Sequence, residues 1–264
     1  MEQLKNLRER TGAGMVECKK ALEEAAGDLE KAIEILRKKG IAKAAKRGDR
    51  EAKEGIVIVG VNDNNTEGYI LEVNSETDFV SRNEKFQSLA NQIFAVVKTT
   101  KPADLDSLMS SPMEGGSVKE NLDNLSGTIG EKLEIKQLAV LTGATVAAYS
   151  HIGGRVGVLV ALNQADKKEL ANDIAMQVAA ASPRYLTPAE VPAEELDKEK
   201  AIYREQLLKE GKPENMLDKI AEGKINKFYS EVCLIKQEFI KDEKQTIENI
   251  LGGVQIDKFI RYSL

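Results

Sequence analysis

The side chains that could do chemistry are few in this sequence. It contains one histidine, His151, and two cysteines, Cys18 and Cys233. A Ser/His/Asp, Cys/His or multi-histidine metal site would have to be built around that one histidine. The cysteines lie far apart, and neither has a CxxC partner or a histidine at metal-ligand spacing. We interpret them as reduced, partly buried thiols and expect neither a metal site nor a cofactor.

A glycine-rich run, Gly153-Gly154-Arg155-Val156-Gly157, could suggest a phosphate-binding loop. We favour a hairpin turn, because a strand and not a helix is predicted to follow the glycines. The sequence has no GxxxxGK[ST], GxGxxG, HExxH or GxSxG motif in a suitable context. His151, beside this turn, is interpreted as a surface or capping residue. An enzyme with His151 as general base is the weakest hypothesis, since no second catalytic residue can be identified.

A polar segment from Asn74 to Asn83 stands between an expected strand and an expected helix. Either Thr77 or Asp78 could cap that helix. Phe79 is the one aromatic residue of the segment, and two hypotheses account for it. The ring folds back onto its own helix as a hydrophobic staple, or it is presented to a partner as an aromatic anchor. The sequence leaves both open.

Composition indicates a soluble, helix-rich globular protein. The 264 residues are 42% apolar and 31% charged, with a net charge of −5. This acidic balance argues against a chain that coats nucleic acid throughout, although a local basic patch can still matter. No apolar run is long enough to span a membrane, and the first residues lack the apolar stretch of a signal peptide. We therefore expect two or three compact units and a cytoplasmic location.

Residues 1–40 are expected to form a head of three short helices. The third is the clearest, because apolar residues recur at i, i+3, i+4 and i+7: Leu29, Ala32, Ile33 and Leu36. Residues 41–54 are rich in basic side chains and poor in bulky apolar ones. We interpret them as a basic linker, or a frayed and solvated helix, that separates the head from the rest.

A hairpin followed by a helix is predicted twice in the remainder. The two helices align without gaps, Leu89-Ala90-Asn91 with Leu170-Ala171-Asn172, Ile93 with Ile174 and Val97 with Val178. Each copy is expected to close with another strand, near Leu133 and near Val254. The predicted fold is therefore α+β, with two related subdomains, 55–140 and 141–264. Each has a small antiparallel sheet of about three strands, covered on one face by helices.

The second subdomain carries an insertion at about residues 193–231, which is dense in Glu and Lys. Its sparse apolar residues keep near-heptad spacing, and Gly211-Lys212-Pro213 interrupts it. This pattern predicts two antiparallel helices that project from the body. A solvated spacer is the less favoured alternative.

Longer motifs resemble one known family. Residues 7–15 (LRERTGAGM), 18–22 (CKKAL) and 27–28 (GD) closely resemble the N-terminal signature of bacterial-type translation elongation factor Ts. Residues 72–74 (EVN) and 77–80 (TDFV) resemble the second signature of that family, and the likeness continues through 154–160 (GRVGVLV) and 227–229 (KFY). The resemblance covers nearly the whole chain and is far more specific than any short catalytic pattern.

The resemblance implies a guanine-nucleotide exchange factor without a chemical step of its own, with elongation factor Tu as its partner in the GDP-bound and nucleotide-free forms. It also implies a ubiquitin-associated-like head, two homologous subdomains and a protruding coiled-coil hairpin. In the family, the Thr-Asp-Phe-Val segment enters the GTPase near the nucleotide's Mg²⁺ and is proposed to dislodge it. Carried over to this sequence, the partner-binding residues are Thr77, Asp78, Phe79, Val80, Arg8, Met15, Val16, Arg47, His151 and Gly153.

Two departures from the family pattern are visible. Relatives commonly continue into a C-terminal helical module, whereas this chain stops at Leu264, so we expect that contact to be missing and the affinity to be lower. Val16 stands where many relatives have a second methionine, which keeps the apolar character but not the reach.

An alternative hypothesis is a ribosome- or RNA-associated accessory protein. A cluster of basic residues favours it: Lys38, Lys39, Lys43, Lys46 and Arg47. The absence of aromatic residues interleaved for base stacking disfavours it, and we expect no direct contact with nucleic acid and none with a membrane. Self-association, as a homodimer or a 2:2 complex, is left open because small sheets have exposed faces and edges.

Overall fold

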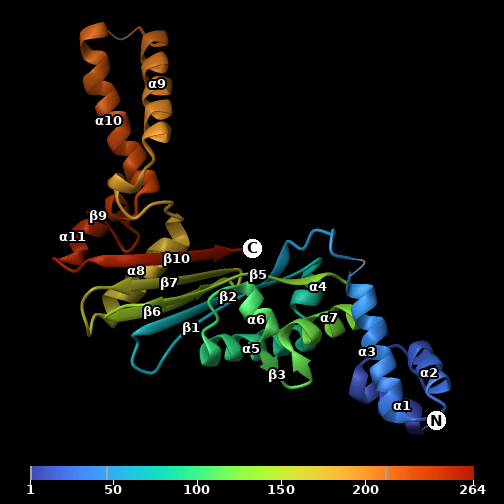
Figure 1. Ribbon diagram of the computed structural model, residues 1–264. Coiled ribbons are helices and arrows are strands. Elements are labelled where there is room, and N and C mark those ends of the chain that lie inside the picture. The colour runs from blue at the N-terminus through green and yellow to red at the C-terminus, as the bar shows by residue number, and fades with distance from the viewer. Residues whose placement is uncertain (1, 46, 212) are drawn as a thin grey trace.

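The computed structural model describes residues 2–45, 47–211 and 213–264, without the side chains of Lys43, Ala45, Glu214, Asn215, Met216 and Asp218. A small helical head lies at one end, a body of sheets and helices in the middle, and a long helical hairpin at the other end (Figure 1). Small antiparallel sheets combined with many helices confirm the predicted α+β class.

The head contains α1 (Glu2–Thr11), α2 (Met15–Glu24) and the first half of α3 (Leu29–Ala45). Its core is built mostly from small side chains, which let three short helices approach closely: Leu7, Ala13, Cys18, Ala21, Ala25 and Ala32. Gly27, at φ +84°, ends the α2 turn, and Asp28 Oδ1 accepts a hydrogen bond from the Lys31 N–H at 3.1 Å. Asp28 therefore caps α3, as its side-chain type predicts.

Helix α3 continues past Gly40 to Ala45, so the stretch interpreted as a linker begins as a helix. Its second half packs against α7 (Val118–Ile129). At the crossing, a Cβ built on Gly127 would lie only 2.5 Å from the Gly40 Cα, so the two backbones touch. The linker interpretation assumed that this stretch has too few bulky apolar side chains to pack. Here α3 and α7 pack through the close approach of the backbones at Gly40 and Gly127 instead. Arg37 adds an ion pair with Glu120 at 2.7 Å.

Two three-stranded antiparallel sheets form the body. The first has the order β1-β2-β5 and the second, given in the same direction, the order β6-β7-β10. In each sheet the second strand of the hairpin is central and the last strand pairs with it. The strands are β1 (Glu54–Val61), β2 (Glu67–Ser75), β5 (Leu133–Thr142), β6 (Thr145–His151), β7 (Val156–Leu162) and β10 (Ile256–Ser263). Two short hairpins are added: β3 (Pro112–Met113) with β4 (Gly116–Ser117), and β8 (Glu238–Phe239) with β9 (Asp242–Thr246).

Helices cover the outer face of each sheet. The first sheet is covered by α5 (Glu84–Thr100), α6 (Leu105–Ser110) and α7, and the second by α8 (Lys168–Ala181) and α11 (Ile247–Leu251). The residues aligned between the two copies are buried in pairs: Ala90 with Ala171, Ile93 with Ile174 and Val97 with Val178. Both helices end at a residue with φ +47°, Lys101 and Ser182. The sequence alignment of the two helices therefore corresponds to matching positions in the fold.

The inner faces of the two sheets pack against each other. Val57 and Ile70 of the first sheet meet Val146 and Leu159 of the second. Gly157 permits the close approach, because a Cβ there would lie 2.5 Å from Val57 Cγ1. The expectation that each small sheet leaves an open face is therefore wrong, since the sister sheet covers it.

Helices α9 (Ala193–Lys209) and α10 (Glu214–Val232) lie side by side and project away from the second sheet (Figure 1). Leu207 and Leu217 are buried between them, and Lys224 Nζ donates to Gln206 Oε1 at 3.2 Å. Between the body and the hairpin lie two 3-10 turns, η1 (Pro188–Glu190) and η2 (Leu234–Lys236). Lys212, in the predicted break between the helices, lies outside the described residues.

Both cysteines are free and buried, and burial raises the pKa of the Cys233 thiol to about 11. The thiolate is the reactive form, so we expect Cys233 of the folded protein to be alkylated about 100-fold more slowly at pH 8 than after denaturation. Mass spectrometry of a Cys18→Ser variant treated with iodoacetamide measures this rate. Rapid alkylation under native conditions would contradict the buried placement.

No helix within the described ranges is long and apolar enough to cross a bilayer.

Candidate functional site

The predicted anchor lies on a single helical turn, α4 (Asp78–Ser81), which directly follows β2. The Phe79 side chain is 84% exposed, whereas Val80 is only 7% exposed and packs into the core beneath the first sheet. Val80 therefore fixes the turn while Phe79 faces solvent. The hypothesis that Phe79 folds back as a hydrophobic staple is wrong.

The helix cap differs from the prediction. Thr77 precedes α4 in an extended conformation, but its hydroxyl donates to Glu131 Oε1 at 2.7 Å and caps nothing. Asn83 caps α5, because its side-chain oxygen accepts from the Lys85 N–H at 2.9 Å. Asp78 stays part-exposed and pairs with Arg82, one turn later, at 3.0 Å. Its carboxylate is therefore at the surface, beside Phe79.

The glycine-rich run forms the turn between β6 and β7, with His151 opposite Val156, which confirms the hairpin prediction. The turn lies against β1: the Val57 N–H donates to the Gly154 carbonyl at 2.7 Å. A Cβ on Gly154, at φ +86°, would come within 2.9 Å of Ile56 Cγ1. Glycine is therefore required at this position by both conformation and space.

The same turn lies close to α4. Arg155 Nη1 forms an ion pair with Glu54 Oε2 at 2.7 Å. In the antiparallel ladder, Glu54 of β1 lies opposite Ser75, the last residue of β2 before α4. The Glu54 carboxylate raises the pKa of Arg155, and the charge of Asp78 adds to this effect. The fold thus brings the α4 segment and the β6–β7 turn together, although they are far apart in sequence.

Within this turn, His151 is half-buried and Gly153 is exposed. Tyr149 Oη lies 3.0 Å from His151 Nδ1, and the two rings are stacked with their centroids 5.8 Å apart. This partner orients the imidazole.

Sequence reasoning missed one exposed apolar residue here, Ile152. Its side chain is 66% exposed, and its φ is +49°. A β-branched residue in the left-handed region is strained, and such strain is retained mainly where the surroundings or a function demand it. An isoleucine next to two glycines at a turn is the signal that could have found it. Ile152 adds exposed apolar surface to the β6–β7 turn.

Two of the predicted head residues, Arg8 of α1 and Met15 of α2, share one surface. Arg8 and Met15 line a hollow of about 430 Å³, together with Glu2, Leu4 and Lys5. Met15 and Val16 are 52% and 67% exposed. An exposed methionine beside an arginine, followed by an exposed valine, suits contact with another protein.

Arg47 is placed differently. It is half-buried, and its Nη1 donates to the Ser126 carbonyl at the end of α7 at 3.2 Å. Arg50 is also held within the chain, by Glu76. Among the basic residues that favour an RNA partner, Lys38 pairs with Glu34 and Lys39 with Glu24. Lys46 and the side chain of Lys43 lie outside the described part of the chain.

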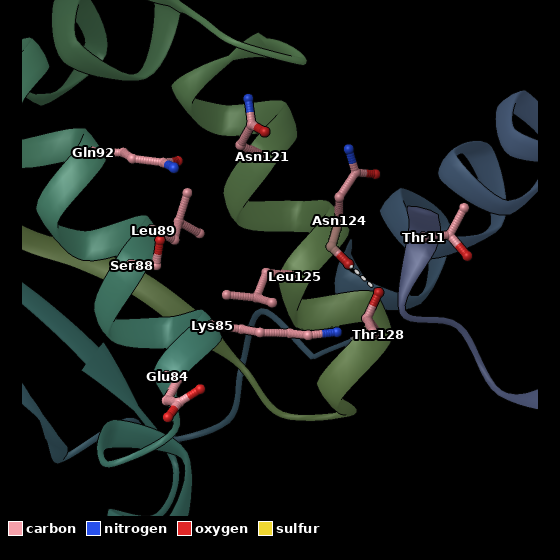
Figure 2. Close-up of a pocket in the computed structure, with 10 residues that line it drawn as sticks. All are labelled: Thr11, Glu84, Lys85, Ser88, Leu89, Gln92, Asn121, Asn124, Leu125 and Thr128. Carbon is pink, nitrogen blue, oxygen red and sulfur yellow. Dashed lines mark hydrogen bonds between the residues drawn. The ribbon is translucent and has the colours of Figure 1, made fainter. Parts of the chain in front are cut away.

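A cleft of about 470 Å³ lies between α5, α7 and the end of α1 (Figure 2). Amide and hydroxyl side chains dominate its lining: Thr11, Ser88, Gln92, Asn121, Asn124 and Thr128. Lys85 crosses toward the head, where a Cβ on Gly12 would meet its Nζ at 2.6 Å. The cleft contains neither histidine nor cysteine. Among the described residues, no group of three His, Cys, Asp or Glu side chains could hold a metal ion.

Comparisons with known proteins agree with this architecture. The family described as elongation factor TS matches residues 76–264. An elongation factor Ts from Prosthecochloris aestuarii (strain DSM 271 / SK 413) is 43% identical over 278 aligned residues, which cover 99% of this chain and 96% of that relative. On both counts, the chain belongs to the elongation factor Ts family.

Proposed function

We propose that this protein is the guanine-nucleotide exchange factor of elongation factor Tu and that Phe79 is the side chain that opens the nucleotide site. Membership of the elongation factor Ts family supports the exchange role in translation elongation. The observation that carries the role of Phe79 is its exposure of 84% on a turn that Val80 anchors from below. A large apolar ring kept in water by a rigid turn is suited to burial in a partner.

The proposed mechanism needs no covalent step. A GTPase holds its nucleotide through a phosphate loop and a Mg²⁺ that bridges phosphate oxygens, so a wedge that shifts these elements weakens several contacts together. Burial of the Phe79 ring supplies about 2–3 kcal/mol, and each 1.4 kcal/mol spent on weaker nucleotide binding is about tenfold in affinity. Asp78 brings a negative charge next to the ring, which disfavours phosphate groups nearby.

Thermodynamic linkage fixes how the cycle ends. If binding of this protein loosens GDP, then GDP loosens this protein by the same factor. A guanine nucleotide that rebinds to elongation factor Tu therefore displaces the exchange factor.

Two further surfaces contribute in this proposal. Arg8, Met15 and Val16 of the head bind the same GTPase, and the turn with His151 and Gly153 approaches its phosphate-binding side. The support for the second contact is the position of this turn next to α4, which the Arg155–Glu54 pair maintains.

The proposed function is tested by stopped-flow release of a fluorescent GDP from elongation factor Tu, with and without the protein. We expect acceleration that saturates with protein concentration and tolerates moderate salt. Release at the uncatalysed rate would contradict the proposal. Tight binding to isolated RNA that falls steeply with salt would instead favour the accessory RNA-binding hypothesis.

A further inference from the structure

Two short connections lie side by side at the end of the first sheet. Residues 76–77 lead from β2 into α4, and residues 130–132 lead from α7 into β5. The ladder between β2 and β5 ends where Ser75 lies opposite Leu133. Beyond this pair, side-chain carboxylates take over the bonding between the two segments.

Glu131 holds Thr77 through two hydrogen bonds. The Thr77 backbone N–H donates to Oε2 at 3.0 Å, and the Thr77 hydroxyl donates to Oε1 at 2.7 Å. A reciprocal contact follows, in which the Lys132 N–H donates to Glu76 Oε1 at 2.5 Å. This N–H, together with the Arg50 guanidinium, holds the pKa of the Glu76 carboxyl below its usual value. Each connection thus contributes one carboxylate to the other.

The backbone beneath Glu131 is itself fixed. Gly130, at φ +93°, ends α7, and its N–H donates to the Ser126 carbonyl at 2.9 Å. The buried Ser126 hydroxyl donates to the Glu131 carbonyl at 2.6 Å. On the other side, the Ser75 hydroxyl donates to the Thr77 carbonyl at 2.9 Å. The carboxylate therefore joins two segments that are each rigid.

We propose that Glu131 is a positioning residue that orients α4, and with it the Phe79 ring, before the partner binds. This inference rests on the proposed role of Phe79. Thr77 directly precedes α4, and the exposed ring has almost no packing of its own to fix its direction. Hydrogen bonds to a carboxylate are about twice as strong as neutral ones, so two of them restrain the turn effectively. A pre-oriented ring lowers the ordering cost of binding.

Exchange kinetics test this inference. Glu131→Ala removes both acceptors, and we expect the second-order rate constant for accelerated GDP release to fall about tenfold. Thr77→Val removes only the hydroxyl and should cause a smaller fall. Glu114→Ala, in the exposed turn between β3 and β4, is the matched control and should have no effect.

A double-mutant cycle separates positioning from a general structural role. If Glu131 acts through the ring, Glu131→Ala adds no further loss in a Phe79→Ala background, because nothing is left to orient. Additive losses in the double variant would overturn the inference. Thr77→Val provides the same cycle if Glu131→Ala does not fold.

A second readout does not depend on elongation factor Tu. Amide hydrogen exchange of Ser81 and Arg82, whose N–H groups donate to the Thr77 and Asp78 carbonyls, reports the order of α4. We expect Glu131→Ala to speed this exchange about tenfold and to leave the buried part of α5 unchanged. Unchanged amide hydrogen exchange in α4 would overturn the inference about Glu131 even if the protein accelerates GDP release. If Glu131→Ala speeds amide hydrogen exchange in α4 but the wild-type protein does not accelerate GDP release from elongation factor Tu, only the proposed function is contradicted.

Discussion

Replacing Phe79 with alanine is expected to lower the accelerated release of GDP by an order of magnitude or more and to leave the fold intact. The ring is 84% exposed, so its removal creates no cavity, and Val80 still anchors α4. Stopped-flow release of fluorescent GDP measures the first effect, and thermal unfolding followed by circular dichroism measures the second. Unchanged acceleration would remove Phe79 from the mechanism.

Two control variants separate the exposed ring from other apolar side chains. Phe86, which is 1% exposed in α5, should affect mainly stability. Phe86→Ala leaves a cavity that lowers the free energy of unfolding by about 3–5 kcal/mol. Ile240, exposed in the turn between β8 and β9, should tolerate alanine without a change in stability or exchange. A loss of exchange in Ile240→Ala equal to that in Phe79→Ala would show that the assay responds to surface apolar area in general.

Replacing Gly127 with alanine is expected to push α3 away from α7 and so displace the head. The added Cβ would lie 2.5 Å from the Gly40 Cα and 2.8 Å from the Gly40 carbonyl oxygen, and backbone atoms cannot move aside as a side chain can. Overpacking of this kind costs about 1–3 kcal/mol, which exceeds the gain of about 1 kcal/mol from alanine in a helix. The head surface would then lose its position relative to Phe79, and more protein would be needed for half-maximal exchange.

Gly223 provides the matched control, because it lies in α10 and a Cβ there would meet nothing within 4 Å. Gly223→Ala should therefore raise the free energy of unfolding by up to about 1 kcal/mol, opposite in sign to Gly127→Ala. Chemical denaturation measures both, and limited proteolysis of residues 47–53 reports detachment of the head. If both variants were stabilised, the close crossing of α3 and α7 would be refuted.

Much of the fold could be predicted because it depends on local patterns. The spacing of Leu29, Ala32, Ile33 and Leu36 gives one apolar face to a helix, whatever surrounds it. The runs around residues 55–75 and 144–162 are rich in β-branched and other apolar residues, as strands are, and turn residues separate the strands of each pair. The matching helices α5 and α8 could be aligned because the same burial pattern is imposed on both copies.

The candidate site was predicted only in part. Phe79 could be singled out as the one aromatic residue in a polar stretch, but the choice between staple and anchor required the exposure of its ring. Glu131 and Ile152 were missed for different reasons. A glutamate in a chain with 43 acidic residues carries no signal of its own, and the strain at Ile152 is a property of the backbone and not of the residue type.

The sequence by itself determined the three helices of the head, the hairpin-and-helix unit that occurs twice, the helical hairpin and the family. Local periodicity and long motifs carry that information, because each depends on neighbouring residues. Only the tertiary structure decided that α3 crosses α7 at Gly40 and Gly127, that the two sheets cover each other, and that the Glu131 carboxylate accepts hydrogen bonds from Thr77, the residue before α4. These contacts join segments distant in the chain, and they depend on how closely two backbones can approach, which no local pattern specifies.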